Sequence, residues 1–529
     1  MCRWPGRALT FTTFLAVAFA WPAVHASAGP PASPAVTLVD RTQTGGYVEE
    51  TAFIPSGPYA NHIVMTNGRT VYGVPAAAAA DASIKPLFDS RAVGWAVPPK
   101  GMTYIESERA FAFVEGGSPE TLFRADDRGR PLPPTPITYL PEPLDSLHNE
   151  GLVHLPPSSK HFPDHLLMVA NRFPAEPPFI KATIEVLRRD GTVVAQIVPD
   201  APLDRNYLTA IAVKDADHLL VGLNDQIWTI DFDGHIVGSP VTTPGPFVEG
   251  IERLPDGRFV ASGADRLYFF DSNLDRLPGD DRDAGIGLGL FPFGITWNGA
   301  TNEHLALTAP EDAGDYFTPR SVTAMSPDLT SARTVLDLAD ADRSRIVSGG
   351  IDHLGAERRT AVLLWRTAVA PPGQILLVDE DGNEVERIDV PLANGSRSPR
   401  QLAYLPRTDQ FAIVYLGASR DHKIVLVSRT GELVGEIDLA PAGIAQISAL
   451  TAFATDDRIL VFGSAGLDGG RAVVIDSTGT VVQEFNYLSE LDMLAAHDLA
   501  TVTSGPLAGA FTAVDAFPGF EVVTFRLGP

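Results

Sequence analysis

The feature that most constrains this chain is a two-strand hairpin pattern that recurs along nearly its whole length. Each copy is a strand of alternating apolar residues, a turn rich in Asp, Thr and Gly, and a second alternating strand. The clearest copies cover residues 184–197, 227–237, 375–388, 424–437 and 473–485. No segment keeps a helical period across three turns, so the pattern predicts an all-β protein.

A second pattern, a small residue followed by an apolar strand, recurs between the hairpins. Its clearest copies begin at Gly101, Gly151, Gly250, Gly294 and Gly350, and weaker ones begin near Glu50, Ala210, Gln401, Ala449 and Asp498. Together the two patterns define about ten repeats of roughly fifty residues, each with room for four short strands. Four-stranded sheets repeated at this period are typical of a β-propeller, whose blades bury their faces against one another.

The number of rings stays open at this point. Propellers usually have four to eight blades, so ten repeats fit either two five-bladed modules or one large ring. The charged and then Gly-rich stretch 280–289 is the best candidate linker. We therefore expect N-terminal propeller repeats over residues 29–284 and C-terminal repeats over 285–529. Pairing of an early strand at 36–39 with the last strand at 521–526 would instead favour one ring.

The N-terminus has the pattern of a signal peptide, which we expect over residues 1–28. Arg3 and Arg7 form a basic segment, and an uncharged apolar run follows it over residues 8–21. This run is too short to span a bilayer, so we expect a secreted or periplasmic protein without membrane insertion. Cys2 is the only cysteine in the sequence and precedes the expected cleavage site. The processed chain should therefore have no disulfide and no cysteine metal ligand.

The formal net charge is −25 at pH 7. Nucleic acids and anionic lipid surfaces would repel such a chain, which argues against both as partners. An extracellular or periplasmic protein or a glycan remains as the expected partner.

The residue just before each repeat's first strand is the best guide to a site, because in a propeller these strands begin at the mouth of the central channel. In the first five repeats this residue is Glu at three positions, Glu49, Glu150 and Glu249, and Lys100 at another. Converging carboxylates repel one another unless a cation lies among them, and their oxygens suit Ca²⁺ or another divalent metal. In the alternative interpretation the recurring Glu marks common repeat ancestry or pairs with Lys100.

Four further residues are candidates for ligand binding. Asn149 and Asn206 fall near the glutamates in the repeat alignment, whereas Arg400 and His497 stand at the same level in the last five repeats. The two basic residues would favour an anionic group, although single basic residues in loops are usually solvated surface. No Gly-x-Ser-x-Gly or His-Glu-x-x-His motif occurs in the sequence, so whether the chain is an enzyme stays open.

The Asp-x-x-Gly hairpins resemble those of the broad NHL and YVTN group of secreted bacterial propellers. Within the wider propeller class, gluconolactonase-type enzymes carry a Glu-Gly pair at the first inner strand, and that Glu holds a catalytic divalent metal. Glu150-Gly151 and Glu249-Gly250 are similar to that pair, but Leu152 and Ile251 stand where those enzymes usually have Pro.

Two functions follow as hypotheses. The first is a binding or scaffold protein that presents its channel mouth and loops to a protein or glycan partner. The second is a divalent-metal-dependent lactonase or esterase with the metal on the channel-mouth glutamates.

Overall fold

The computed structural model describes residues 35–528 apart from short gaps, so the expected signal peptide lies outside the described residues. The gaps are 45–47, 68–69, 78–84, 90–98, 116–120, 140–145, 175–179, 246, 264–265, 284–287, 289, 311–318, 320, 339–345, 366–372, 391–395, 418–421, 440–441, 445, 465–469, 477, 494–495 and 516–519. The expected domain boundary at 284–285 falls in one of them.

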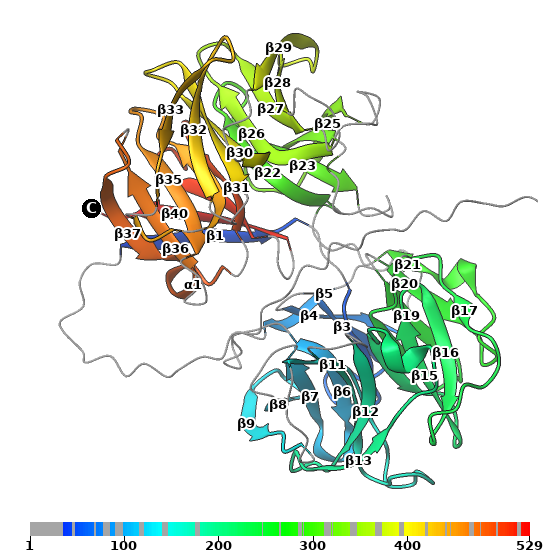
Figure 1. Cartoon of the computed structure of the whole chain (residues 1–529). Coiled ribbons are helices and arrows are strands. Elements are labelled where there is room, and N and C mark those ends of the chain that lie inside the picture. Colours follow the sequence, from blue (N-terminus) through cyan, green and yellow to red (C-terminus); the bar gives the residue numbers. More distant parts are fainter. Residues whose placement is uncertain are drawn as a thin grey trace, which may run out of the picture.

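The described residues form ten antiparallel sheets of four strands each, which confirms the predicted all-β propeller architecture (Figure 1). In nine of the sheets the four strands follow one another directly along the chain. The tenth combines the last three strands with the first one, in the order β1-β40-β39-β38.

Five sheets form a first ring. Its blades are β2 (Thr51–Ile54), β3 (His62–Asn67), β4 (Thr70–Pro75) and β5 (Lys85–Asp89); β6 (Pro99–Ile105), β7 (Ala110–Glu115), β8 (Thr121–Asp126) and β9 (Pro131–Pro136); β10 (Ser146–His154), β11 (Leu166–Phe173), β12 (Lys181–Leu187) and β13 (Val193–Ile197); β14 (Ala210–Val213), β15 (His218–Leu223), β16 (Gln226–Asp231) and β17 (Val241–Thr242); and β18 (Gly250–Arg253), β19 (Phe259–Gly263), β20 (Arg266–Phe270) and β21 (Arg282–Asp283). The innermost strands contact one another in the order β2, β6, β10, β14 and β18, and β18 contacts β2 again.

The other five sheets form a second ring. Its blades are β22 (Leu290–Asn298), β23 (Glu303–Pro310), β24 (Ser321–Met325) and β25 (Ala332–Asp337); β26 (Ile346–Leu354), β27 (Arg359–Trp365), β28 (Gly373–Val378) and β29 (Glu384–Val390); β30 (Ser396–Leu405), β31 (Gln410–Gly417), β32 (His422–Ser428) and β33 (Leu433–Ile437); β34 (Gln446–Ala452), β35 (Ile459–Ser464), β36 (Gly470–Ile475) and β37 (Val481–Asn486); and β38 (Ala496–Thr501), β39 (Phe511–Asp515), β40 (Glu521–Leu527) and β1 (Val36–Gln43). Its innermost strands β22, β26, β30, β34 and β38 contact in turn, and β38 returns to β22. A one-turn helix, α1 (Tyr487–Glu490), follows β37.

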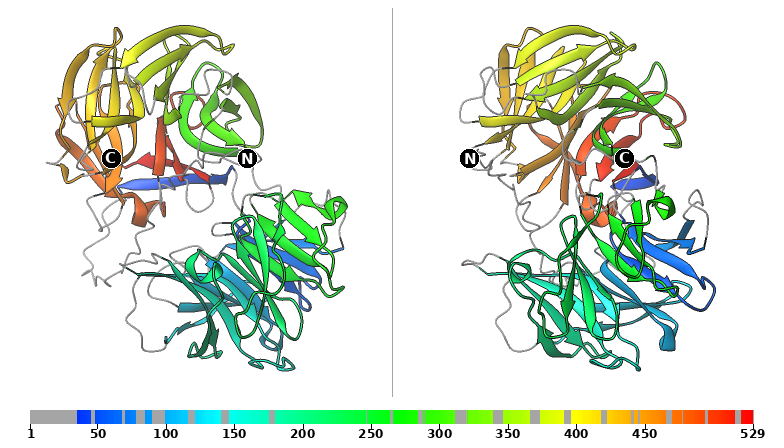
Figure 2. Two further views of the ribbon diagram at one scale, coloured as in Figure 1. Left: turned by 45° about the vertical axis from the view of Figure 1, so that its right-hand side comes forward. Right: turned by 90° about the vertical axis from the view of Figure 1, so that its right-hand side faces the viewer.

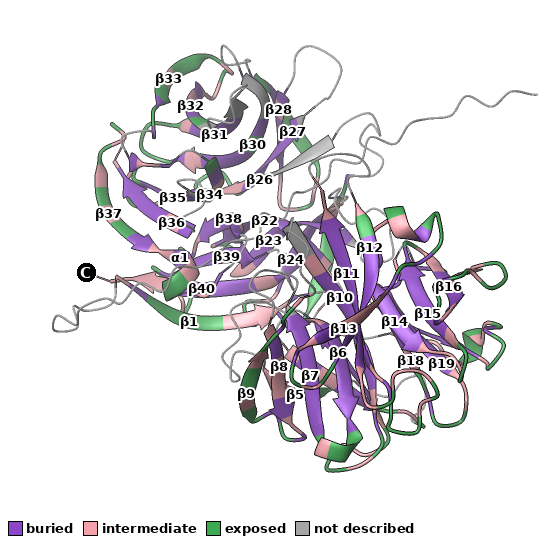
Figure 3. Cartoon of the chain, turned by 60° about the horizontal axis from the view of Figure 1, so that its bottom comes forward, coloured by how far each residue is buried: buried purple, intermediate pink, exposed green. Residues whose placement is uncertain are grey.

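Each ring is closed by a hydrophobic core between its first and last blades. In the first ring Ile63 and Met65 of one blade pack with Val260 and Phe269 of the fifth. In the second ring a matching core joins residues of β22 to β24 with residues of β38 to β40. The two rings are visible as separate bodies in Figure 2, and their inner strands are buried while many outer strands are exposed (Figure 3).

The first strand of the described residues, β1, belongs to the second ring. Val36 pairs with Leu527 and Gln43 with Glu521, so β1 is the outer strand of the last blade, where it lies blue beside the red β40 (Figure 1). This terminal pairing was expected to favour one ring of all ten repeats, but the structure shows that it closes only the second. The whole first ring is thus inserted between β1 and β22. At the crossing, the Thr44 carbonyl accepts a bond of 2.8 Å from the Leu288 backbone N–H.

The recurring glycine before the inner strand has a steric cause. A Cβ on Gly250 would lie 2.6 Å from the backbone nitrogen of Thr51, and a Cβ on Gly151 would lie 2.9 Å from that of Ile211. Real Cβ atoms do not approach backbone nitrogen so closely. Five inner strands converge tightly around the ring axis, so most blades have only Gly or Ala at this position.

The Asp-x-x-Gly segments form the hairpin turns that the sequence predicts. At one of them the Asp379 carboxylate accepts the backbone N–H groups of Asp381 and Asn383 at 3.0 and 2.8 Å, and Gly382 has a φ of +82°. Only glycine adopts this conformation freely, which explains the fixed Asp–Gly spacing. None of the helices described in the structure is both long and apolar enough to cross a membrane.

Candidate functional site

The glutamates and the lysine that the repeat alignment selects gather at one end of the channel of the first ring, although Lys100 falls within β6 and Glu150 within β10. Lys100 lies among the three glutamates that the sequence analysis selected, close enough to interact electrostatically with Glu49, Glu150 and Glu249. Its ammonium donates a hydrogen bond to Oε1 of Glu49 and forms an ion pair with it. We call Glu49, Glu50, Lys100, Glu150, Glu249 and Tyr207 the acidic mouth.

Lys100 is the positive centre of the acidic mouth. Burial alone would lower the pKa of its ammonium, but the three carboxylates outweigh that effect and raise the pKa above its ordinary value. Lys100 is therefore charged at any physiological pH. The side chain of Glu49 is 6% exposed. Burial raises its pKa more than the attraction of Lys100 lowers it, so the pKa stays above its ordinary value.

Glu50 is a member of this site that sequence reasoning missed. It occupies the alignment position where the other blades of the first ring have Gly or Ala, and it is almost completely buried. Its Oε1 accepts the backbone N–H of Gly151 at 3.2 Å. Burial, followed by repulsion from Glu150 and Glu249, raises its pKa well above the usual value. The break in the small-residue column was the signal that could have identified it.

Glu150 is tied to a tyrosine that sequence reasoning also missed. The Tyr207 hydroxyl donates a hydrogen bond to Oε1 of Glu150. Burial raises the pKa of Glu150 to about 8, although Lys100 and Tyr207 oppose the shift. Burial and then the neighbouring carboxylates raise the pKa of Tyr207 well above its ordinary value, so this hydroxyl keeps its proton.

Aromatic rings extend the acidic mouth next to Glu150. The ring centroids of His148 and Phe173 lie 5.2 Å apart, and that of Tyr207 lies 6.1 Å from Phe173. Phe173 and Tyr207 are half-buried. The site thus combines a carboxyl-rich floor with a partly accessible aromatic wall.

Glu249 is the most accessible carboxyl of the group. It is half-buried, and burial raises its pKa to about 7 against the attraction of Lys100. Within the described part of the chain no hydrogen bond reaches its carboxylate. At neutral pH this side chain is divided between its charged and neutral forms.

The two asparagines selected from the sequence have local partners instead. The Asn149 amide donates to the Tyr139 hydroxyl at 3.0 Å. Asn206 donates to the Pro202 carbonyl at 2.7 Å, within the loop that precedes β14. No hydrogen bond joins either one to a glutamate of the acidic mouth among the described residues.

In the second ring the two basic candidates differ from each other. Arg400 is exposed. Burial, with a smaller contribution from Arg400, lowers the pKa of His497 to about 4, so its imidazole is neutral at pH 7. Its ring also packs edge-on to Phe293 at 6.2 Å. Of these two candidates, only Arg400 could thus supply charge to an anion.

Two inner strands of the second ring carry hydrogen-bonded acids, the half-buried Asp352 and the buried Asp498. Asp352 accepts hydrogen bonds from the Thr296 hydroxyl at 2.8 Å and from the Tyr404 backbone N–H at 2.6 Å. These two bonds join β26 to β22 and to β30. Asp498 accepts the Ile295 N–H at 2.9 Å. Burial raises the pKa of Asp352 to about 6 and that of Asp498 well above its usual range. These acids join neighbouring blades.

Among the described residues, the ligand atoms of Glu49, Glu150 and Glu249 do not all lie within 4.8 Å of one another. That spacing occurs at Asp231, Asp233 and His235. This is one of the exposed hairpin turns. Oδ1 of Asp231 already accepts the backbone N–H groups of Asp233 and His235 at 2.9 Å each. The arrangement is therefore explained by turn chemistry.

No family model matches the chain, and no curated protein does. Among solved structures, one similar chain is described as "Streptogramin B lyase structure", with a TM-score of 0.28 and 15% sequence identity over 61% of this chain and 93% of that chain.

Proposed function

We propose that this chain is an exported binding protein whose first ring holds a glycan at the acidic mouth. The observation that carries the proposal is the position of Lys100 among Glu49, Glu150 and Glu249. An internal ammonium supplies the positive charge that converging carboxylates need, so they require no bound metal for electrostatic balance.

The protonation of the acidic mouth suits hydroxyl groups. With pKa values of about 8 and about 7, Glu150 and Glu249 carry protons for a large part of the time at neutral pH. A protonated carboxyl both donates and accepts hydrogen bonds, as a sugar hydroxyl does. The half-buried rings of Phe173 and Tyr207 offer apolar faces beside these polar groups, a combination common in ligand sites.

A glycan array with the purified protein tests this proposal. We expect saturable binding of a subset of glycans that weakens in Glu249→Gln and Tyr207→Phe. The matched control is Glu252→Gln, which removes a carboxyl from the other end of the same inner strands and should leave glycan binding unchanged. If the protein binds no glycan and instead captures a basic protein segment, the glycan proposal is wrong and the partner is a protein.

A metal-dependent hydrolase remains the second candidate because of one observation. Oε2 of Glu49 is buried and has no hydrogen-bond partner in the described residues. Such an orphan oxygen, with the Glu-Gly pairs that resemble those of gluconolactonases, supports a divalent metal in the acidic mouth. Elemental analysis before and after chelation separates the two candidates. One retained equivalent of metal and a chelator-dependent melting temperature would favour the hydrolase.

Export and family membership are part of the same proposal. The basic and apolar pattern of residues 1–28 supports a signal peptide, and the hairpin turns support a relationship to the NHL and YVTN propellers. N-terminal sequencing of the protein recovered outside the cytoplasm would test the cleavage site.

A further inference from the structure

A cavity of about 360 Å³ opens at the end of the first ring opposite to the acidic mouth. Its lining comes from the last residues of four inner strands and from the loops that follow them, including Phe53, Thr103, His154, Glu252 and Arg253. The inner strands run from the acidic mouth toward this end, so the two sites share the same set of strands and occupy their opposite ends.

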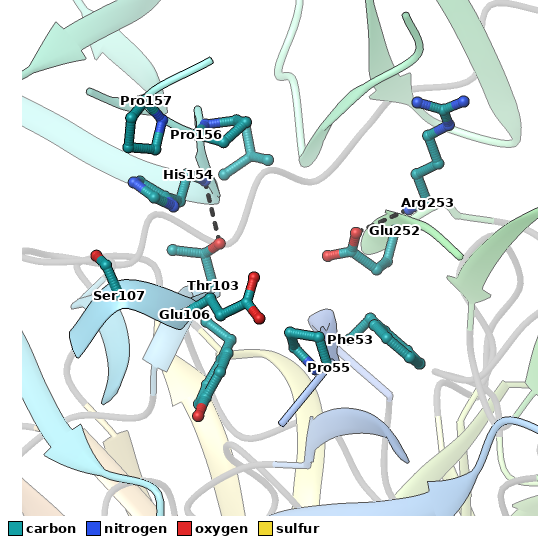
Figure 4. Close-up of a pocket in the computed structure, with 12 residues that line it drawn as sticks. Phe53, Pro55, Thr103, Glu106, Ser107, His154, Pro156, Pro157, Glu252 and Arg253 are labelled. Atoms are coloured by element: carbon teal, nitrogen blue, oxygen red, sulfur yellow. Dashed lines mark hydrogen bonds between the residues drawn. The ribbon is translucent and has the colours of Figure 1, made fainter. Parts of the chain in front are cut away.

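Two carboxylates face this cavity. Figure 4 shows Glu106, from the loop after β6, and Glu252, from β18, both directed into the same space. Neither has an ion-pair partner within the described part of the chain. The Arg253 guanidinium points away from them (Figure 4), and Arg253 contributes only its backbone N–H, which donates to Oε1 of Glu252 at 2.8 Å.

The other polar groups of the cavity have partners of their own. The Ser107 hydroxyl accepts a hydrogen bond of 2.9 Å from the Arg189 guanidinium, which forms ion pairs with Glu108 and Asp164. The Thr103 hydroxyl accepts the His154 backbone N–H at 3.1 Å. Nε2 of His154 lies 3.3 Å from Oδ1 of Asp164, and burial lowers the pKa of this imidazole below its ordinary value. His154 is therefore uncharged at pH 7. The other lining is largely apolar, with Pro55, Pro156 and Pro157 among its residues.

This charge pattern differs from that of the acidic mouth in one decisive respect. The acidic mouth contains Lys100, whereas no ammonium or guanidinium of the described residues forms an ion pair with Glu106 or Glu252. Burial raises the pKa of Glu252 to about 8, and only backbone hydrogen bonds oppose the shift. A positively charged guest would supply the missing counter-ion.

We propose that this cavity binds a small organic cation with an apolar body, such as an alkylated or aromatic ammonium, with Glu252 and Glu106 as its counter-ions. Carboxylates would hold the charged head, and the proline and aromatic side chains would contact the apolar part. The cation would displace a proton from Glu252 as it binds. This site is independent of the glycan site at the acidic mouth.

Calorimetric titration with benzyltrimethylammonium tests the proposal, because this probe keeps its charge at every pH. The neutral control is benzyl alcohol. We expect saturable binding of the cation only, which strengthens as pH rises from 6 to about 8 and then levels off as Glu252 becomes ionised. Titration in buffers of different ionisation enthalpy should show proton release at pH 7.

Two variants make the outcome decisive. Glu252→Gln should weaken binding at least about tenfold, the effect of losing a charged partner. Glu106→Gln should weaken it about two- to fivefold, because Glu106 is exposed and solvent screens its charge. Glu249→Gln, at the acidic mouth, should leave it unchanged. Equal binding of benzyl alcohol, or unchanged affinity in both cavity variants, would overturn the proposal. Should one cavity variant fail to fold, the pH dependence in the unmodified protein and the other variant still decide it.

Discussion

Gly151 donates its backbone N–H to Oε1 of Glu50 at 3.2 Å, and this bond joins the first and third blades of the first ring. A five-bladed ring is narrow enough for a side chain from one blade to reach the backbone of a blade that is not its neighbour. Acids near the axis therefore link blades of the ring, and we expect their substitution to change its stability.

The first prediction concerns the pH dependence of stability. Folding raises the pKa of Glu150 from 4.5 to about 8 and that of Glu249 from 4.5 to about 7. At a pH between the unfolded and the folded pKa of each group, the folded state therefore binds more protons than the unfolded chain. Stability should then fall as pH rises from 5 to 8, by on the order of a few kcal/mol in total. Glu150→Gln should flatten this dependence, as measured by chemical denaturation at both pH values.

Hydrogen exchange of first-ring peptides would assign this effect to the correct ring. Glu432→Gln, on a hairpin turn of the second ring, serves as the control and should leave the pH profile as it was. A stability that rises from pH 5 to 8 in the first ring would contradict the protonated state described for the acidic mouth.

The second prediction concerns Lys100. Lys100→Met leaves Glu49 buried without its ion-pair partner, and we expect a loss of about 3 kcal/mol in the free energy of unfolding. The double variant with Glu49→Gln should recover much of this loss. If Lys100 substitutes for a metal, the single variant should also gain Ca²⁺ affinity, seen as a melting temperature that rises with Ca²⁺.

A double-mutant cycle measures the coupling between the two residues. Additive effects of the single substitutions would show that the pair contributes nothing specific. No response of Lys100→Met to Ca²⁺ would show that the carboxylates do not converge closely enough to bind a metal.

The third prediction concerns the glycine column at the ring axis. Gly250→Ala places a Cβ 2.6 Å from the backbone nitrogen of Thr51, which forces the first and fifth blades apart. We expect a loss of about 1–3 kcal/mol, as for other overpacked sites. Gly435→Ala is the matched control, because that glycine also lies in a strand and its added Cβ meets nothing within 4 Å. Equal melting temperatures for the two variants would show that the inner strands at Gly250 and Thr51 are farther apart than this distance requires.

Much of the fold could be predicted because its signals are local. A hairpin turn with Asp and Gly, such as that at Asp379, defines its two strands without reference to the rest of the chain. The number of rings could not be predicted in this way, because it depends on whether β18 packs against β2 or against β22. That choice rests on the fit of side chains such as Met65 and Phe269, which no repeat alignment contains.

The candidate site residues also differ in whether a local sequence signal identifies them. Glu49, Glu150 and Glu249 could be selected because they share one position in the repeat. Tyr207 could not, since it lies in a loop that varies between blades. The lowered pKa of His497 depends on burial by tertiary neighbours, so its sequence position alone suggested a charge that the folded protein does not give it.

The pairing of β1 with β40 also constrains how the chain is made. Arg41 and Glu521 form an ion pair across a separation of 480 residues, so β1 cannot pair with β40 until nearly all of the described chain has been synthesised. All strands of the first ring, β2 to β21, precede the second ring's last strand, so the first ring can close before β40 is made. The second ring can close only after β40 is made. Until then β1 lacks its strand partner, and unpaired strand edges are prone to aggregation. From this connectivity we expect the second ring to close later than the first.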